Sequence, residues 1–144
     1  MTIFVPRSAS DDEILTVIRN WIDALAREQY ELVADALGYA LAFGRPKHDC
    51  IREAIRAYSS ATYYPSIERF VVTDWRTARG GNESRKQEVV RYEPNSTGLV
   101  GAVAFDLPLN GTWSNLTADF VFFEGSDPMQ GFPLGLEEIH SSET

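Results

Sequence analysis

Three side chains of this sequence, Asp74, Tyr58 and His140, could take part in acid–base chemistry. Asp74 lies in a segment rich in β-branched and aromatic residues. If it faces the interior, burial would raise its pKa and make it a general base, with Tyr58 as a hydrogen-bond donor. Both faces of this segment are apolar, so alternation does not decide between that orientation and a solvated one. His140 follows Glu138 by two residues, and the two could form an acid–base pair or an exposed strand end.

Large aromatic side chains suggest a second kind of site. The candidates are Trp21, Tyr58, Tyr63 and Trp75. They could line a cavity for a small hydrophobic ligand, with tyrosine hydroxyl groups to orient it. They are also the right size to fill a core between helices and a curved sheet. The sequence leaves both interpretations open.

Metal and cofactor sites have no recognisable motif in the chain. It has two histidines, His48 and His140, and one cysteine, Cys50, and it lacks H-x-x-x-H, H-E-x-x-H and C-x-x-C. His48 and Cys50 are two residues apart on a predicted helix, and neighbours at this spacing do not face each other. The phosphate-loop and G-x-S-x-G motifs are absent as well. We therefore expect no metal and no cofactor, and we expect Cys50 to be a small core residue.

Composition and charge argue against several classes of protein. The 144 residues are 44% hydrophobic and 24% charged, which is ordinary for one globular domain. Lys and Arg number 13 against 21 Asp and Glu, and the formal net charge of −8 argues against nucleic acid as a partner. No stretch approaches the ~18–20 apolar residues that span a bilayer, and the N-terminus does not resemble a signal peptide. A single cysteine fits a reducing compartment, so we expect the cytoplasm.

The first half of the chain is predicted to be helical. Ser10 and Glu13 have the spacing of a capping box and precede an apolar stripe, which predicts a helix over residues 11–27. Further stripes predict a second helix over residues 30–42 and a third over residues 46–61.

The second half is predicted to form antiparallel strands. The expected strands cover residues 67–77, 87–93 and 134–140, together with a long hairpin that turns at Asn110-Gly111, a type I′ signal. With Leu109 opposite Thr112, Phe105 is opposite Leu116, and one face of the hairpin is apolar. Three polar residues then lie on the face opposite the core, where we expect solvent or a partner subunit. They are Asp106, Asn115 and Asp119.

These elements predict one α+β domain over residues 1–144, with N-terminal helices packed on a curved antiparallel sheet and loose termini at 1–9 and 141–144. The order of elements, the segment Asp106–Phe120 (DLPLNGTWSNLTADF) and the closing Leu136–His140 (LEEIH) resemble small uncharacterised bacterial members of the NTF2-like superfamily. The resemblance implies a cone, in which the sheet wraps around the first helix and leaves a pocket. It implies no functional residue, because this superfold hosts both enzymes and binding domains.

Three functions are therefore compatible with the sequence. The first is a non-catalytic domain that binds a small molecule or a protein, as a homodimer through the Val100 and Val121 side of the sheet. The second is a small-molecule lyase or isomerase of the ketosteroid-isomerase type, with Asp74 or His140 as the base. The third is an acidic protein that neutralises a basic partner, which rests on net charge alone.

Overall fold

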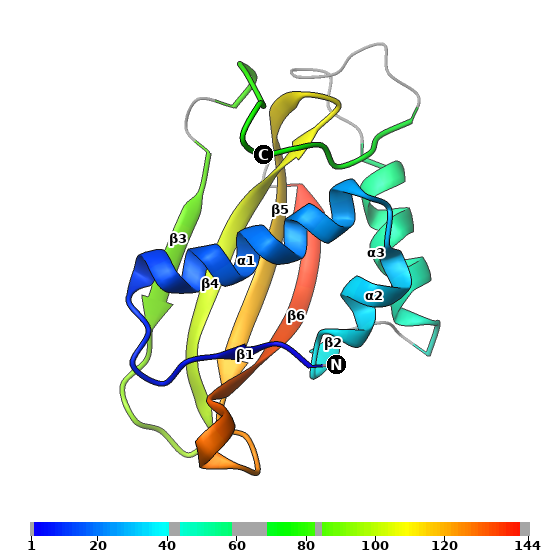
Figure 1. Cartoon of the computed structure of the whole chain (residues 1–144). Coiled ribbons are helices and arrows are strands. Elements are labelled where there is room, and N and C mark those ends of the chain that lie inside the picture. Colours follow the sequence, from blue (N-terminus) through cyan, green and yellow to red (C-terminus); the bar gives the residue numbers. More distant parts are fainter. Residues whose placement is uncertain (1, 41–43, 59–68, 83–84, 142–144) are drawn as a thin grey trace.

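In the computed structural model, a curled antiparallel sheet carries α1 across one of its faces, and α2 and α3 lie beside its β6 side (Figure 1). The structure describes residues 2–40, 44–58, 69–82 and 85–141. The helices are α1 (Asp11–Ala26), α2 (Tyr30–Asp35), α3 (Lys47–Arg56) and the short 3-10 helix η1 (Pro128–Gln130). The strands are β1 (Phe4–Val5), β2 (Tyr39–Ala40), β3 (Gln87–Arg91), β4 (Leu99–Leu109), β5 (Thr112–Phe123) and β6 (Phe132–Ser141).

The strand order is β1-β6-β5-β4-β3, with every neighbouring pair antiparallel, and β2 adds a short parallel pairing to β6. The predicted α+β class, with helices on a curved antiparallel sheet, is confirmed. Strands 87–91 and 132–141 also match the predicted strands 87–93 and 134–140.

Helix α1 forms where its capping signal predicted. The Ser10 hydroxyl accepts a hydrogen bond from the Glu13 amide, and the Ser10 amide donates one to Glu13 Oε1, both at 3.2 Å. Such a cap contributes about 1 kcal/mol to helix stability. One stripe of the helix is buried against the sheet: Ile14, Ile18, Trp21, Ile22 and Leu25. This stripe is the helical half of the core.

Helix α2 is shorter than predicted. It ends at Asp35 instead of residue 42, and the following residues join the sheet. The Gly38 amide donates to the Leu134 carbonyl at 2.9 Å, and Tyr39–Ala40 pairs with β6 as β2. Pairing with β6 satisfies the backbone of residues 38–40, and the glycine weakens any continued helix.

Two further predictions need correction or fall outside the described residues. Helix α3 ends at Arg56 instead of residue 61, and residues 59–61 lie outside the description. The expected strand over residues 67–77 is wrong for its described part, residues 69–77, which holds only an isolated bridge from Val72 to Leu109. Asn110 instead fixes this segment to the hairpin tip, because its side chain accepts from the Val71 amide and donates to the Arg69 carbonyl.

The hairpin turn is confirmed, but the register changes further along. Asn110 and Gly111 have φ values of 51° and 85°, the positive values that a type I′ turn requires, and Leu109 pairs with Thr112. Between Pro108 and Asp106 the register shifts by two residues, so Phe105 pairs with Ala118 and not with Leu116. A shift of two preserves alternation, and the apolar face therefore still faces the helices.

The N-terminal residues are more ordered than the expected loose terminus over 1–9. Phe4–Val5 pairs with β6 as β1, and Val5 is almost fully buried. The Ile3 amide donates to the Ala36 carbonyl at 2.6 Å. At the other end Ser141 belongs to β6, whereas residues 142–144 lie outside the description.

Candidate functional site

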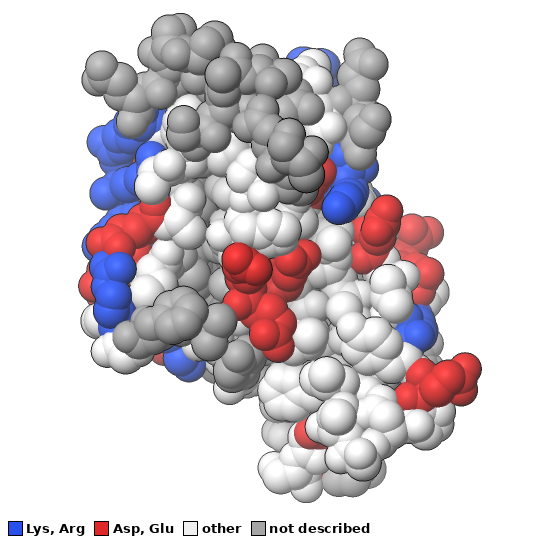
Figure 2. Space-filling model, turned by 180° about the vertical axis from the view of Figure 1, so that it is seen from behind, with Lys and Arg blue, Asp and Glu red and all other residues white. Residues whose placement is uncertain are grey.

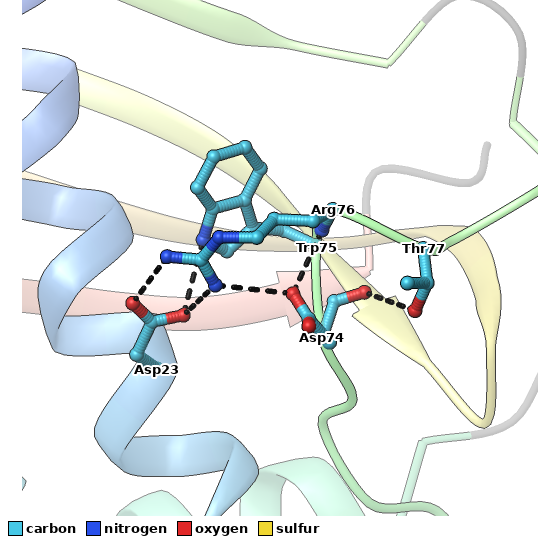
Figure 3. A network of polar contacts seen from close by, with 5 residues as sticks. All are labelled: Asp23, Asp74, Trp75, Arg76 and Thr77. Atoms are coloured by element: carbon cyan, nitrogen blue, oxygen red, sulfur yellow. Dashed lines mark hydrogen bonds and ion pairs between the residues drawn. The ribbon is translucent and has the colours of Figure 1, made fainter.

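Asp74 is exposed at the start of a turn next to α1 (Figure 3). Its carboxylate accepts hydrogen bonds from the Arg76 amide at 2.9 Å and from Arg76 Nη1 at 3.2 Å. These bonds, first the one from the backbone amide, hold the pKa of Asp74 below its ordinary value. Of the two orientations that the sequence left open for Asp74, the structure shows the solvated one, with the carboxylate exposed.

Trp75 belongs to a clamp between this turn and α1. Its indole nitrogen donates to Asp23 Oδ1 at 3.1 Å, and Arg76 reaches both oxygens of Asp23 at 2.8 and 3.0 Å. The guanidinium of Arg76 lies 4.4 Å from the centre of a Trp75 ring, and that of Arg19 lies 5.1 Å away (Figure 3 shows Arg76). The indole nitrogen and ring of Trp75 thus serve to attach the turn to the helix.

Trp21 and Tyr58 occupy the core. Trp21 is 2% exposed, donates from its indole nitrogen to the Val33 carbonyl at 2.9 Å, and meets Phe120 edge-on. Tyr58, just after α3, is buried and donates its hydroxyl proton to Asn115 Oδ1. Of the predicted pocket-lining residues, Tyr63 lies outside the described residues. Trp21 and Tyr58 support the core interpretation, whereas Trp75 belongs to the clamp on α1.

Asp106 and Asn115 are buried, which corrects the expectation that they face solvent or a partner. Asp106 accepts hydrogen bonds from Asn82 Nδ2 at 2.9 Å, the Lys86 amide at 2.8 Å and Thr117 Oγ1 at 2.5 Å. Residues 82 and 86 therefore come over the outer face of the sheet here, where alternation alone predicted solvent. Asp106 is an anchor for this segment, since three donors occupy its oxygens.

His140 lies near Glu138, which was one of the two arrangements that the sequence left open, and the structure adds Asp119 to the pair. His140 Nε2 and Asp119 Oδ2 are 2.6 Å apart, and one ligand atom from each of the three side chains lies within 4.8 Å of the others. Asp119 and His140 are half-buried and Glu138 is exposed. The sequence motifs missed this cluster because it joins two strands whose pairing could not be predicted.

A groove of about 430 Å³ lies between α3 and β6. Its apolar lining includes Ile51 and Ala54 from α3 and Leu136 and Ile139 from β6. Charged residues lie at its margins: Arg45, Lys47, Glu53, Glu137 and Glu138. Cys50 lines it as well, so the cysteine that we expected in the core borders the groove.

A shallower hollow of about 280 Å³ lies on the outer face of the sheet, with Val90, Tyr92 and Val121 in its lining. Among the described residues, no helix is long and apolar enough to cross a membrane. The expected homodimer through this face stays a prediction.

Fold and site together define an α+β protein with a filled helix–sheet core, a groove beside α3 and an acidic cluster on the outer sheet face. Comparisons with protein-family models, with curated proteins and with solved structures find no match to the chain.

Proposed function

We propose that this protein is a non-catalytic, NTF2-like domain that binds a small hydrophobic carboxylate in the groove between α3 and β6. The groove itself carries the proposal, because its volume of about 430 Å³ falls within the ~300–1,000 Å³ of small-molecule sites. Its lining from Ile51, Ala54, Leu136 and Ile139 would receive the apolar body of such a ligand.

A cation at the margin favours a carboxylate as the polar part of the ligand. Arg45 is already paired with Glu53. The side chain of Lys47 forms no hydrogen bond or ion pair within the described part of the chain, so its ammonium group is available to an incoming anion. A charge-assisted hydrogen bond there would fix the orientation of the ligand.

The isomerase alternative receives less support. Asp74 is exposed, is paired with Arg76 and is not among the residues that line the groove. Tyr58, the proposed hydrogen-bond donor, gives its proton to Asn115. Neither group is placed to act on a ligand between α3 and β6.

A thermal-shift screen of hydrophobic carboxylates tests the proposal, with Ala54→Trp to fill the groove. A ligand at 100 times its Kd adds about 2.7 kcal/mol, which raises Tm by roughly 5–10 °C in a domain of this size. Ala54→Trp should abolish the shift and Lys47→Gln should weaken it. Ala57→Trp is the matched control, because Ala57 is exposed just beyond the same helix. A blank screen, or an equal shift in the Ala54 variant, would refute groove binding.

A second copy of the chain is the second candidate partner. Val90, Ala102 and Val121 lie side by side across β3, β4 and β5, and Val90 is 51% exposed. A two-fold axis through this apolar row would bury it between the two copies.

The bacterial cytoplasm is the proposed location. The chain has one cysteine and cannot form an internal disulfide, which fits a reducing compartment.

A further inference from the structure

Asp119, Glu138 and His140 come from two adjacent strands that hold them in a fixed relation. In the pairing of β5 with β6, Asp119 lies opposite Glu138, and Thr117 lies opposite His140. One ligand atom from each of the three side chains lies within 4.8 Å of the others. Side chains on paired strands keep their positions more accurately than side chains on loops.

A bulge in β6 is what places two of these side chains on the outer face. Leu134 and Leu136 face the core, so strict alternation would turn Glu138 and His140 inward as well. The register shifts between Asp119 and Phe120, and Glu137 becomes an extra residue in β6. This extra residue turns Glu138 and His140 to the side of Asp119. Bulges commonly redirect side chains next to functional sites.

The local charge favours a cation. Asp119 and Glu138 are directly opposed, and like charges in this position destabilise a strand pair. Neither carboxylate has an ion pair with Lys or Arg in the described chain. Figure 2, which views the molecule from behind, shows a group of acidic residues in the middle of the surface and the basic residues toward its margins.

The imidazole can take the tautomer that a metal requires. His140 Nδ1 lies 3.4 Å from the Ser141 carbonyl oxygen, so a proton on Nδ1 can point to this acceptor. Nε2 then has a free lone pair on the side of Asp119. A hydrogen bond from the second ring nitrogen to a carbonyl is the usual companion of a metal-bound histidine.

We propose that Asp119, Glu138 and His140 bind a divalent first-row transition-metal ion, with Zn²⁺ as the probe. One imidazole nitrogen and two carboxylates suit such ions better than Mg²⁺ or Ca²⁺, which prefer oxygen ligands throughout. On binding, the ion replaces the 2.6 Å contact between His140 Nε2 and Asp119 Oδ2. Three protein ligands leave at least one position for water. Glu138 also stands at the margin of the groove, whereas Asp119 and His140 do not line it, and the metal site goes beyond the proposed function.

Isothermal titration of the full, tag-free chain with Zn²⁺ tests the site. We expect one ion per chain, and a loss of affinity of at least about tenfold in His140→Gln and in Glu138→Gln. The chain offers a matched control in His48→Gln, since His48 is the only other histidine and lies 3.3 Å from Asp49. Glu88→Gln, an acid on the same outer face, should also leave binding unchanged.

The outcomes separate this site from incidental binding. No Zn²⁺ binding at about 1 mM, or a loss in the His48 variant instead of the His140 variant, overturns the proposal. Circular dichroism checks the fold of each variant, and the exposed Glu138 carries the test if His140→Gln does not fold. Glu138 borders both sites, so two other variants distinguish them. His140→Gln, whose residue does not line the groove, should lose Zn²⁺ binding and keep the small-molecule shift, whereas Ala54→Trp should do the reverse.

Discussion

Asp119 and Glu138 lie directly opposite each other on β5 and β6, although both carry a negative charge. This arrangement costs stability in the metal-free chain, and His140 compensates only Asp119, through the contact of 2.6 Å. Glu138 therefore weakens the fold of the metal-free chain, and the proposed ion would compensate its charge.

Glu138→Gln should stabilise the metal-free protein by about 0.2–1 kcal/mol, because it removes the like-charge repulsion. Urea denaturation at neutral pH with a chelator present measures this change. With Zn²⁺ added, the order should reverse, since the wild type binds the ion more tightly and gains more stability from it. Glu88→Gln provides the reference for loss of an acid on the same face.

Asp106→Ala should destabilise the protein by about 2–4 kcal/mol, because three buried or half-buried donors lose their acceptor. Chemical denaturation measures the effect, and Asp35→Ala, at the exposed end of α2, is the control. A loss below about 1 kcal/mol would contradict the role of Asp106 as an anchor.

The carboxyl group of Asp74 should titrate below its ordinary pKa of 3.8. Because its folded-state pKa is depressed, its contribution to stability is present above the unfolded pKa and is lost as the pH falls through the folded value. An NMR titration of the side-chain carboxyl carbon follows this directly. Arg76→Ala should move the pKa of Asp74 upward by removing the guanidinium; an unchanged pKa would leave the backbone amide as the sole cause.

Val90→Lys should dissociate a dimer that forms through the outer face, because it places a charge in the apolar row. Light scattering after size exclusion measures the mass of wild type and variant. Leu32→Lys is the matched control, since Leu32 is 54% exposed on α2 and away from this face. If the wild type is a monomer, the apolar row does not bind a second copy of the chain, and the prediction is wrong.

Local signals predicted the elements that depend on local contacts. The capping box predicted where α1 begins, and Asn110-Gly111 predicted the turn, because each signal is satisfied within a few residues. β2 could not be predicted, since its strand character comes from pairing with β6 across a long separation in sequence.

The residues of the candidate sites were also predictable only where local contacts decide their position. His140 and Glu138 could be paired by alternation within one strand, whereas Asp119 required the pairing of β5 with β6. The burial of Asp106 was missed because the segment that covers it is distant in sequence. Asp74 remained undecided because both faces of its segment are apolar.

The extra residue in β6 also makes this strand tolerant of one particular change in length. If a deletion removed Glu137, Leu136 and Glu138 would become neighbours, and their partners Phe120 and Asp119 are already neighbours on β5. Regular alternation would then keep Glu138 and His140 on the outer face and Ile139 on the side of Leu136. One lost codon would thus straighten the strand and preserve the cluster with Asp119. The loss of Glu138 as well would turn Ile139 outward and His140 inward, so β6 can shorten by one residue at this point and not by two.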